Sequence, residues 1–283
     1  MTLDAVRLYQ QADFKAQYRQ LQEDILEAPI IKTGEWQSRD VSDKHEFDTP
    51  ELRNVTVVVD IPATPEELMV QTMARLPWAE DHFLERVSGI PYNPAPSEAW
   101  WPFAQKRDND TNPDHKSEDG GRFSHTYPER MWPKFAMSGE RAPNGRQIYV
   151  PHMGIRFLYG DLMDVVDQLA RSRYTRQAYL PIWFPEDTGA VHRKRVPCTL
   201  GYHFLIRGND LQVTYYMRSC DLMRHYQDDV YMAARLAQWM VWMLNLREDD
   251  SSLVADKLIM HIASLHCFAG DLPIIKYRLS QEK

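Results

Sequence analysis

The stretch PCTLGYHFLIRGNDLQVTYYMRSCD (residues 197–221) predicts two strands joined by a tight turn around Gly208. In an antiparallel hairpin, residues that are equidistant from the turn face each other. Cys198 is therefore expected opposite about Arg218, although twenty positions separate them in the chain. The hairpin should bring a thiol and a guanidinium group to the same edge of a sheet.

The side chains at this edge suggest chemistry. A thiolate is a nucleophile, and nearby cations favour it over the thiol; Arg218 and the basic residues at 193–195 are such cations. Arg218 and Ser219 offer a rigid donor fork and a hydroxyl group, which suit a phosphate. Two plainer readings stay open, an inert cysteine and a strand-end salt bridge between Arg218 and Asp221.

Side chains alternate along a strand, so three residues of the first strand should share one face: Tyr202, Phe204 and Ile206.

Composition limits the possible functions. The 283 residues are 43% hydrophobic with a net charge of -7, which predicts one domain (1–283) and argues against a nucleic-acid polymer as partner. Three cysteines without CxxC spacing argue against a disulfide framework or a structural zinc site, and the ten histidines show no ligand spacing, so no metal is expected. The polar start and the lack of a long apolar run predict a soluble cytoplasmic protein without a signal peptide or membrane partner.

Periodicity elsewhere predicts an α+β fold with a mixed sheet, because helices and strands alternate without a regular βαβ rhythm. Helices are expected at 3–27, 77–88, 160–172 and 229–246, and further strands at 54–61 and 179–184. Thr64 followed by Pro65 is typical of a helix N-terminus. The charged segment 104–124 is expected to be a mobile surface loop.

The motifs, in their order and spacing, resemble the thymidylate synthase superfamily over roughly residues 160–268. The resemblance rests on Pro197-Cys198, on Arg218-Ser219-Cys220-Asp221, on the acidic helix start Asp228-Asp229-Val230, on RYTRQAYLPIWFP with Arg176 and Trp183, and on SLHCF at 264–268.

This resemblance implies a mixed β-sheet flanked by helices and a homodimer packed through its sheets, with a phosphate site shared between the chains. It implies a pyrimidine nucleoside monophosphate as substrate and 5,10-methylenetetrahydrofolate as co-substrate. Cys198 would add to C6 of the base, and C5 would attack the folate methylene. Hydride transfer would then give a methyl group, and water a hydroxymethyl group.

The resemblance also assigns residues. The nucleotide would be bound by Arg218, Ser219, Arg176, Asp229, His266 and Lys32. The folate would be bound by Asp221, Trp132 and Tyr127. For His266 the alternative is a satisfied core histidine, for Lys32 a solvated side chain, and for Trp132 and Tyr127 ordinary core or rim aromatics.

Asp229 is the residue expected to distinguish cytosine from uracil. Thymidylate synthases have asparagine there, which matches uracil, whereas a carboxyl group can accept from cytosine N4 and, when protonated, donate to N3. Burial favours the protonated form. The resemblance therefore points to the deoxycytidylate hydroxymethylase branch, with dCMP favoured. The alternative is that Asp228 and Asp229 only cap a helix.

Several positions depart from the family pattern: Thr199, Gln177, Phe268 and residues 224–227. His82 stands where the family has a water-ordering glutamate, and Glu85, one helical turn away, is expected to replace it. These departures indicate a divergent member of the kind that makes modified nucleotides, such as those of viral DNA. They also keep three alternatives open, namely a dUMP methyltransferase or hydroxymethylase, a nucleotide-binding pseudoenzyme, and a dimeric structural protein.

Overall fold

The computed structural model describes residues 6–36, 39–101, 123, 125–133, 137–141, 147–151, 160–188, 196–247 and 252–281. The loop predicted at 104–124 lies outside these residues, apart from residue 123. The basic residues at 193–195 lie outside them as well.

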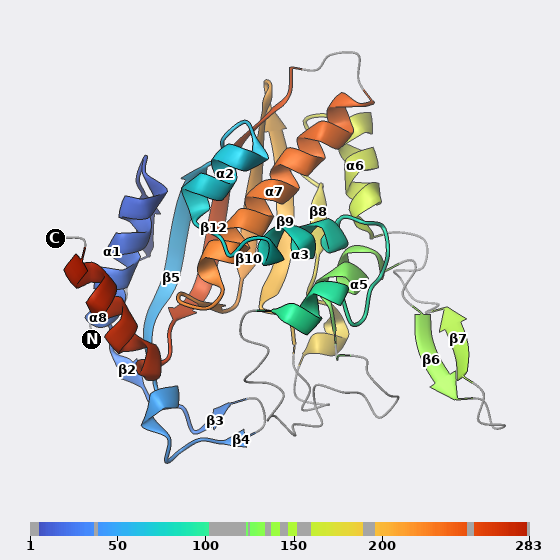
Figure 1. Cartoon of the computed structure of the whole chain (residues 1–283). Helices are drawn as coiled ribbons and strands as arrows, with labels where there is room; N and C mark the ends of the chain where they lie inside the picture. Colours follow the sequence, from blue (N-terminus) through green and yellow to red (C-terminus); the bar gives the residue numbers. More distant parts are fainter. Residues whose placement is uncertain are drawn as a thin grey trace.

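A mixed eight-stranded sheet runs through the protein (Figure 1). Its strands are β1 (Arg7–Gln10), β2 (Ile30–Ile31), β5 (Thr49–Asp60), β8 (Tyr179–Pro181), β9 (Thr199–Arg207), β10 (Asp210–Met217), β11 (Cys220–Asp221) and β12 (Val254–His266). The main path has the order β1-β5-β12-β10-β9-β8, while β2 pairs with β5 and β11 pairs with β12. The pairs β1–β5, β10–β12 and β11–β12 are parallel and the others antiparallel. The predicted α+β class with a mixed sheet is confirmed.

Helices cover one face of this sheet. They are α1 (Phe14–Leu26), α2 (Pro65–Thr72), α3 (Trp78–Arg86), α5 (Tyr127–Met131), α6 (Leu162–Arg171), α7 (Tyr226–Asn245) and α8 (Leu272–Gln281). Figure 1 shows α7 lying along the middle of the sheet, with α2, α3 and α6 around it; α7 contacts β10, β12 and each of these three helices. This packing buries the side chains on the helix-facing side of the sheet, including the predicted trio Tyr202, Phe204 and Ile206.

Small elements complete the described chain. Two short hairpins are β3 (Glu35–Trp36) with β4 (Arg39–Asp40), and β6 (Met137–Arg141) with β7 (Gln147–Pro151). Short 3₁₀ helices are η1 (His45–Phe47), η2 (Pro96–Trp100), η5 (Pro185–Asp187) and η6 (Ala269–Asp271). None of the helices in the described part of the chain is long and apolar enough to cross a membrane.

The β9–β10 hairpin has the predicted turn, and one register shift determines which residues pair at the end away from the turn. Gly201 pairs with Tyr216, but the register then shifts, so that Thr199 pairs with Met217. An unshifted ladder would place position 198 opposite position 219. The bulge instead brings Arg218 opposite Cys198, and the backbone N–H of Arg218 donates to the Cys198 carbonyl at 2.9 Å.

The N-terminal segment differs from the prediction. A helix was expected over 3–27, yet Arg7–Gln10 form strand β1, and helix α1 begins only at Phe14 after its N-cap Asp13. β1 pairs in parallel with β5, with Arg7 opposite Val55. A distant strand edge therefore overrides the local helical pattern, because pairing satisfies backbone groups that sequence periodicity does not reveal. Helices α3, α6 and α7 agree with their predicted segments to within a few residues, and α2 begins after its N-cap Thr64 as expected.

Gly201 is a position where a side chain does not fit. A Cβ atom added there would lie 2.3 Å from the Tyr179 hydroxyl and 2.6 Å from the Leu180 carbonyl oxygen. We predict that Gly201→Ala lowers the free energy of unfolding by about 1–3 kcal/mol, the usual cost of overpacking. Chemical denaturation measures this, with Gly34→Ala as the control, since no atom of the described residues other than its chain neighbours lies within 4 Å of a Cβ built there. Equal stability of the two variants would contradict the prediction.

Candidate active site

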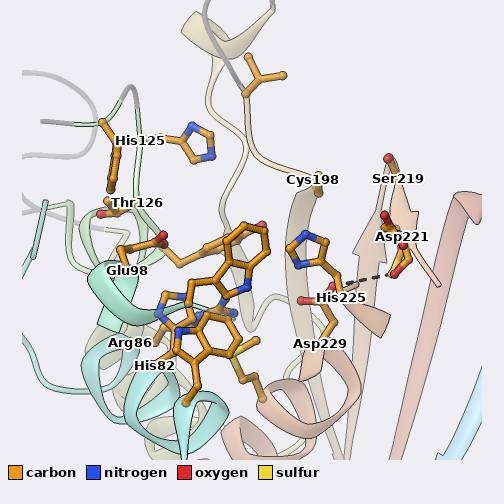
Figure 2. Close-up of a pocket in the computed structure, with 17 residues that line it drawn as sticks. His82, Arg86, Glu98, His125, Thr126, Cys198, Ser219, Asp221, His225 and Asp229 are labelled. Atoms are coloured by element: carbon orange, nitrogen blue, oxygen red, sulfur yellow. Dashed lines mark hydrogen bonds between the residues drawn. The ribbon is translucent and has the colours of Figure 1, made fainter. Parts of the chain in front are cut away.

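A cavity opens where helix α3, the first turn of α7 and the ends of β9 and β10 meet (Figure 2). It is lined by Trp78, His82, Arg86, Glu98, Trp101, Phe123, His125, Thr126, Tyr127, Val196, Cys198, Ser219, Cys220, Asp221, His225, Asp229 and Met232. Four of the residues singled out in the hairpin and the helix after it line this cavity together: Cys198, Ser219, Asp221 and Asp229.

Cys198 stands at the entrance of β9, half-buried at the cavity wall. Its sulfur lies 3.8 Å from Nη2 of Arg218, so the predicted juxtaposition of thiol and guanidinium is confirmed. A cation at this distance favours the thiolate, which is the nucleophilic form of cysteine. The geometry suits covalent catalysis, whereas an inert core cysteine needs neither a cation nor a cavity.

The Arg218 guanidinium is also held in place by the backbone. Nε donates to the Pro197 carbonyl at 2.8 Å, and Nη2 donates to the Val196 carbonyl at 3.0 Å. These bonds leave Nη1 without a hydrogen bond to any described residue. Ser219 follows Arg218 in the chain and lines the cavity. One nitrogen of the fork and a hydroxyl group are thus available for an anionic ligand.

Asp229 is the carboxyl group of α7 that faces the cavity. It lies in the first turn of the helix, and the Cys220 sulfur is 3.7 Å from its Oδ2. Burial raises the pKa of Asp229 to about 7, against the opposing effect of the Arg86 guanidinium. At neutral pH the group can therefore be either a hydrogen-bond donor or a carboxylate.

Asp228, the neighbouring carboxyl group, has a different role. It is buried and accepts hydrogen bonds from the backbone N–H of Arg75 at 2.8 Å and from Nε of Arg75 at 2.9 Å. It thereby ties the start of α7 to the segment before α3. Neither carboxyl group accepts from a first-turn N–H of α7 within the described structure, and the N-cap position is His225. The alternative that both acids merely cap the helix is not supported.

Asp221 is buried at the end of β11, and it also lines the cavity. Its Oδ1 accepts from the backbone N–H groups of Met223 and Arg224, both at 2.9 Å. Burial raises the pKa of this carboxyl group as well. Asp221 thus offers a fixed oxygen acceptor beside the aromatic part of the cavity wall.

Glu85 lies outside the cavity lining, unlike the expectation. Its carboxylate accepts from the Ser97 backbone N–H at 2.7 Å and lies 3.4 Å from Nδ1 of His82. Residues 82 and 86 share the cavity-facing side of α3, since they are four positions apart, and Glu85 is turned away from it. His82 itself lines the cavity, as does Glu98 of η2. Burial lowers the pKa of His82, which favours the neutral imidazole.

Four other predicted residues are not part of the cavity lining. Trp132 is a core side chain whose Nε1 donates to the Arg86 carbonyl at 2.9 Å. His266 has a buried Nδ1 without a hydrogen bond to the described residues, and Lys32 is exposed. Arg176 is exposed on the opposite face of the sheet, beside Tyr179, Leu200, His203 and Tyr216.

Tyr127 is the predicted aromatic that does line the cavity, and the Thr199 hydroxyl donates to its oxygen at 3.1 Å. Sequence reasoning missed further aromatic groups of the wall, among them Trp78 and Trp101. The Trp101 ring stacks on His225 at 5.2 Å between centroids, and Trp78 stacks on His82 at 5.0 Å. These residues carried no motif, and only packing brings them together.

Comparison with known families agrees with this geometry. The family model for thymidylate synthase matches residues 131–283, which is more than half of the chain and includes Cys198, Arg218, Asp221 and Asp229. No curated protein matches the chain.

Proposed function

Because the chain belongs to the thymidylate synthase family, we propose that it is a one-carbon transferase that modifies C5 of a pyrimidine nucleoside 5′-monophosphate, with methylenetetrahydrofolate as co-substrate. The observation that carries this proposal is the position of the Cys198 sulfur, which lies 3.8 Å from a guanidinium nitrogen and on the wall of a cavity that also contains Asp229. This pairs a nucleophile with a titratable group that can contact the pyrimidine edge.

In the proposed mechanism, the Cys198 thiolate adds to C6 and makes C5 nucleophilic. Arg218 holds the entrance of β9, and with Ser219 it provides donors for the 5′-phosphate. Among the titratable groups on the wall, Glu98, His82 and His225 can accept the C5 proton, directly or through water. Methylenetetrahydrofolate, when bound, supplies the one-carbon unit.

The cavity fits a folate in two respects. The stacked rings of Trp101 and His225, with Trp78 nearby at 6.4 Å from Trp101, offer a flat aromatic surface to a pterin. The buried Asp221 carboxyl group offers an oxygen acceptor to its N–H donors. We assign these residues, rather than the core residue Trp132, to the co-substrate.

For the base, we propose cytosine, and hence dCMP, with a hydroxymethyl group as product. Supporting this is the pKa of about 7 at Asp229, which lets a neutral acid donate to N3 while its other oxygen accepts from N4. The second candidate is uracil, favoured by the donor-only side chain of Arg86 in the same cavity, since a donor matches O4 better than an amino group.

A paired exchange assay tests the proposal. Tritium release from [5-³H]dCMP and [5-³H]dUMP is measured with and without methylenetetrahydrofolate, and product mass separates methyl from hydroxymethyl. We expect release from dCMP at the higher kcat/KM. Release from neither nucleotide would leave a nucleotide-binding pseudoenzyme or a structural protein.

We further propose a homodimer formed through the sheet face opposite α7. This face carries Arg176, His203, Tyr216 and His261, and no helix of the described chain packs on it. Arg176 is exposed on this face and does not line the Cys198 cavity of its own chain, which leaves it available to the site of a partner. A two-fold dimer would let each chain lend Arg176 to the other.

Mixing two inactive variants tests the shared site. Cys198→Ala and Arg176→Ala homodimers should each lose C5 exchange, while an equimolar mixture refolded together should recover about one quarter of wild-type activity, because only sites with both intact residues work. Light scattering reports the mass of each species. No recovery in a mixture that is dimeric would contradict the shared site.

A further inference from the structure

Arg86 is a buried cation that no carboxylate of the described residues pairs with in a salt bridge. Its side chain belongs to the last turn of α3, is 4% exposed and lines the cavity. Within the described structure the guanidinium makes no hydrogen bond, and Nε is fully buried without one. The guanidinium lies over the face of the Tyr127 ring, with 4.1 Å from the guanidinium carbon to the ring centroid.

Two other arginines show what a guanidinium in this protein ordinarily does. Arg130 makes a pair of hydrogen bonds to Asp187 at 2.7 and 2.8 Å, and Arg235 binds Glu80 at 2.8 and 3.1 Å. Buried arginines are expected to be paired, because an uncompensated buried charge is costly. Arg86 therefore retains its donors for something that enters the cavity or forms within it.

Asp229 is the carboxyl group that shares this cavity with Arg86. Figure 2 shows His82 and Arg86 on the α3 wall, with Asp229 on the α7 wall across from them. The guanidinium opposes the rise in the pKa of Asp229. The other charged or titratable groups around Asp229 are Asp228, Arg75, Cys220, Tyr127, Tyr202 and Tyr215. Of these, Asp228 and Arg75 neutralise each other in a salt bridge.

The proposed chemistry moves negative charge toward this pair. When the Cys198 thiolate forms a bond to C6, the C5–C6 π electrons shift to form C4=C5, and the electrons of C4=N3 move onto N3. A proton from the neutral Asp229 carboxyl group neutralises N3. The sulfur loses its charge, the ring stays neutral, and Asp229 becomes a carboxylate.

We propose that Arg86 is a positioning residue that stabilises the carboxylate formed on Asp229 when Cys198 adds to the pyrimidine. This rests on the proposed function and adds a group to its site. The guanidinium is prepositioned by burial and by the Tyr127 ring, so it needs no reorganisation when the charge appears. It acts through Asp229 and has no need to contact the ring.

The test compares Arg86→Gln, Arg86→Lys and Arg235→Gln by tritium release from [5-³H]dCMP. Arg235→Gln is the matched control, because it removes a guanidinium from the same α3–α7 interface, where it bridges to Glu80. We expect Arg86→Gln to lower kcat about 100-fold or more with little change in KM, as for loss of one prepositioned donor. Arg86→Lys should recover part of this loss, and Arg235→Gln should keep kcat. Circular dichroism establishes that each variant is folded.

A second readout does not depend on turnover. Carbon NMR of protein labelled with [4-¹³C]aspartate, with the signal assigned by its loss in Asp229→Asn, reports the titration of Asp229. The pKa of Asp229 should rise in Arg86→Gln and stay in place in Arg235→Gln.

The possible results separate the two proposals. An unchanged kcat in Arg86→Gln, a loss confined to KM, or a pKa that does not move would overturn the role of Arg86 while the proposed function stands. If the wild type releases tritium from neither nucleotide, the proposed function fails and the catalytic role of Arg86 falls with it. The titration then still shows whether the two groups are coupled.

Discussion

Replacing Cys198 by serine should abolish C5 exchange, with a loss of about 10⁴-fold or more, the scale seen when a covalent nucleophile is removed. The physical reason is that a hydroxyl group beside Arg218 remains protonated, whereas a thiol can ionise there. Tritium release from [5-³H]dCMP measures the loss. Intact mass after incubation with 5-fluoro-dCMP and methylenetetrahydrofolate should show a persistent adduct on the wild type and none on the variant.

Cys267 provides the matched control. It is buried, does not line the cavity, and has its pKa raised to about 12, chiefly by burial. Cys267→Ser should therefore keep exchange and adduct formation, apart from a cost in stability. Retained exchange in Cys198→Ser, or an adduct that forms on another cysteine, would refute the assignment of the nucleophile.

Asp229→Asn should reverse the choice of base. An amide accepts from uracil N3–H and donates to O4, so we expect the ratio of kcat/KM for dCMP to that for dUMP to fall about 10²- to 10⁴-fold. The paired exchange assay measures both constants. Asp228→Asn is the control, because that carboxylate is held by Arg75 and does not line the cavity. The Asp228→Asn variant should be less stable but keep its preference for dCMP over dUMP. Equal effects of the two substitutions on this preference would mean that Asp229 does not select the base.

The same group predicts a pH dependence. The pKa of Asp229 is raised to about 7, so the neutral acid that donates to N3 is present below this pH and is lost as the pH rises through it. Exchange of dCMP should therefore decline above about pH 7 with a slope of one proton. In Asp229→Asn this alkaline limb should disappear, and a limb that persists unchanged would belong to another group.

Local rules were enough to predict the hairpin to within one residue of its register. The turn at Gly208 and the alternation of strand side chains place Cys198 near Arg218 without knowledge of any other element. The register shift after the Gly201–Tyr216 pair moves the pairing by one residue and completes the alignment of Cys198 with Arg218. The amphipathic helices and the α+β class follow from periodicity in the same way.

Long-range packing overruled local pattern in two places. Residues 7–10 form a strand because the edge of β5 is available to them. Asp228 and Asp229 are adjacent and chemically identical. Asp228 is bound by Arg75 and has a structural role, whereas Asp229 lines the cavity. No local rule distinguishes them.

The cavity wall opposite Cys198 likewise combines a feature that the sequence predicts with one that only tertiary packing decides. The sequence predicts a helix over 77–88 but not which of its faces meets α7, so it favours Glu85 as the cavity residue, whereas the structure places Arg86 there. By itself the sequence determined the edge where thiol and guanidinium meet, because hairpin geometry depends only on neighbours along the chain. The tertiary structure alone decided which carboxyl group and which buried guanidinium share the cavity, because burial and charge depend on segments that lie far apart in the sequence.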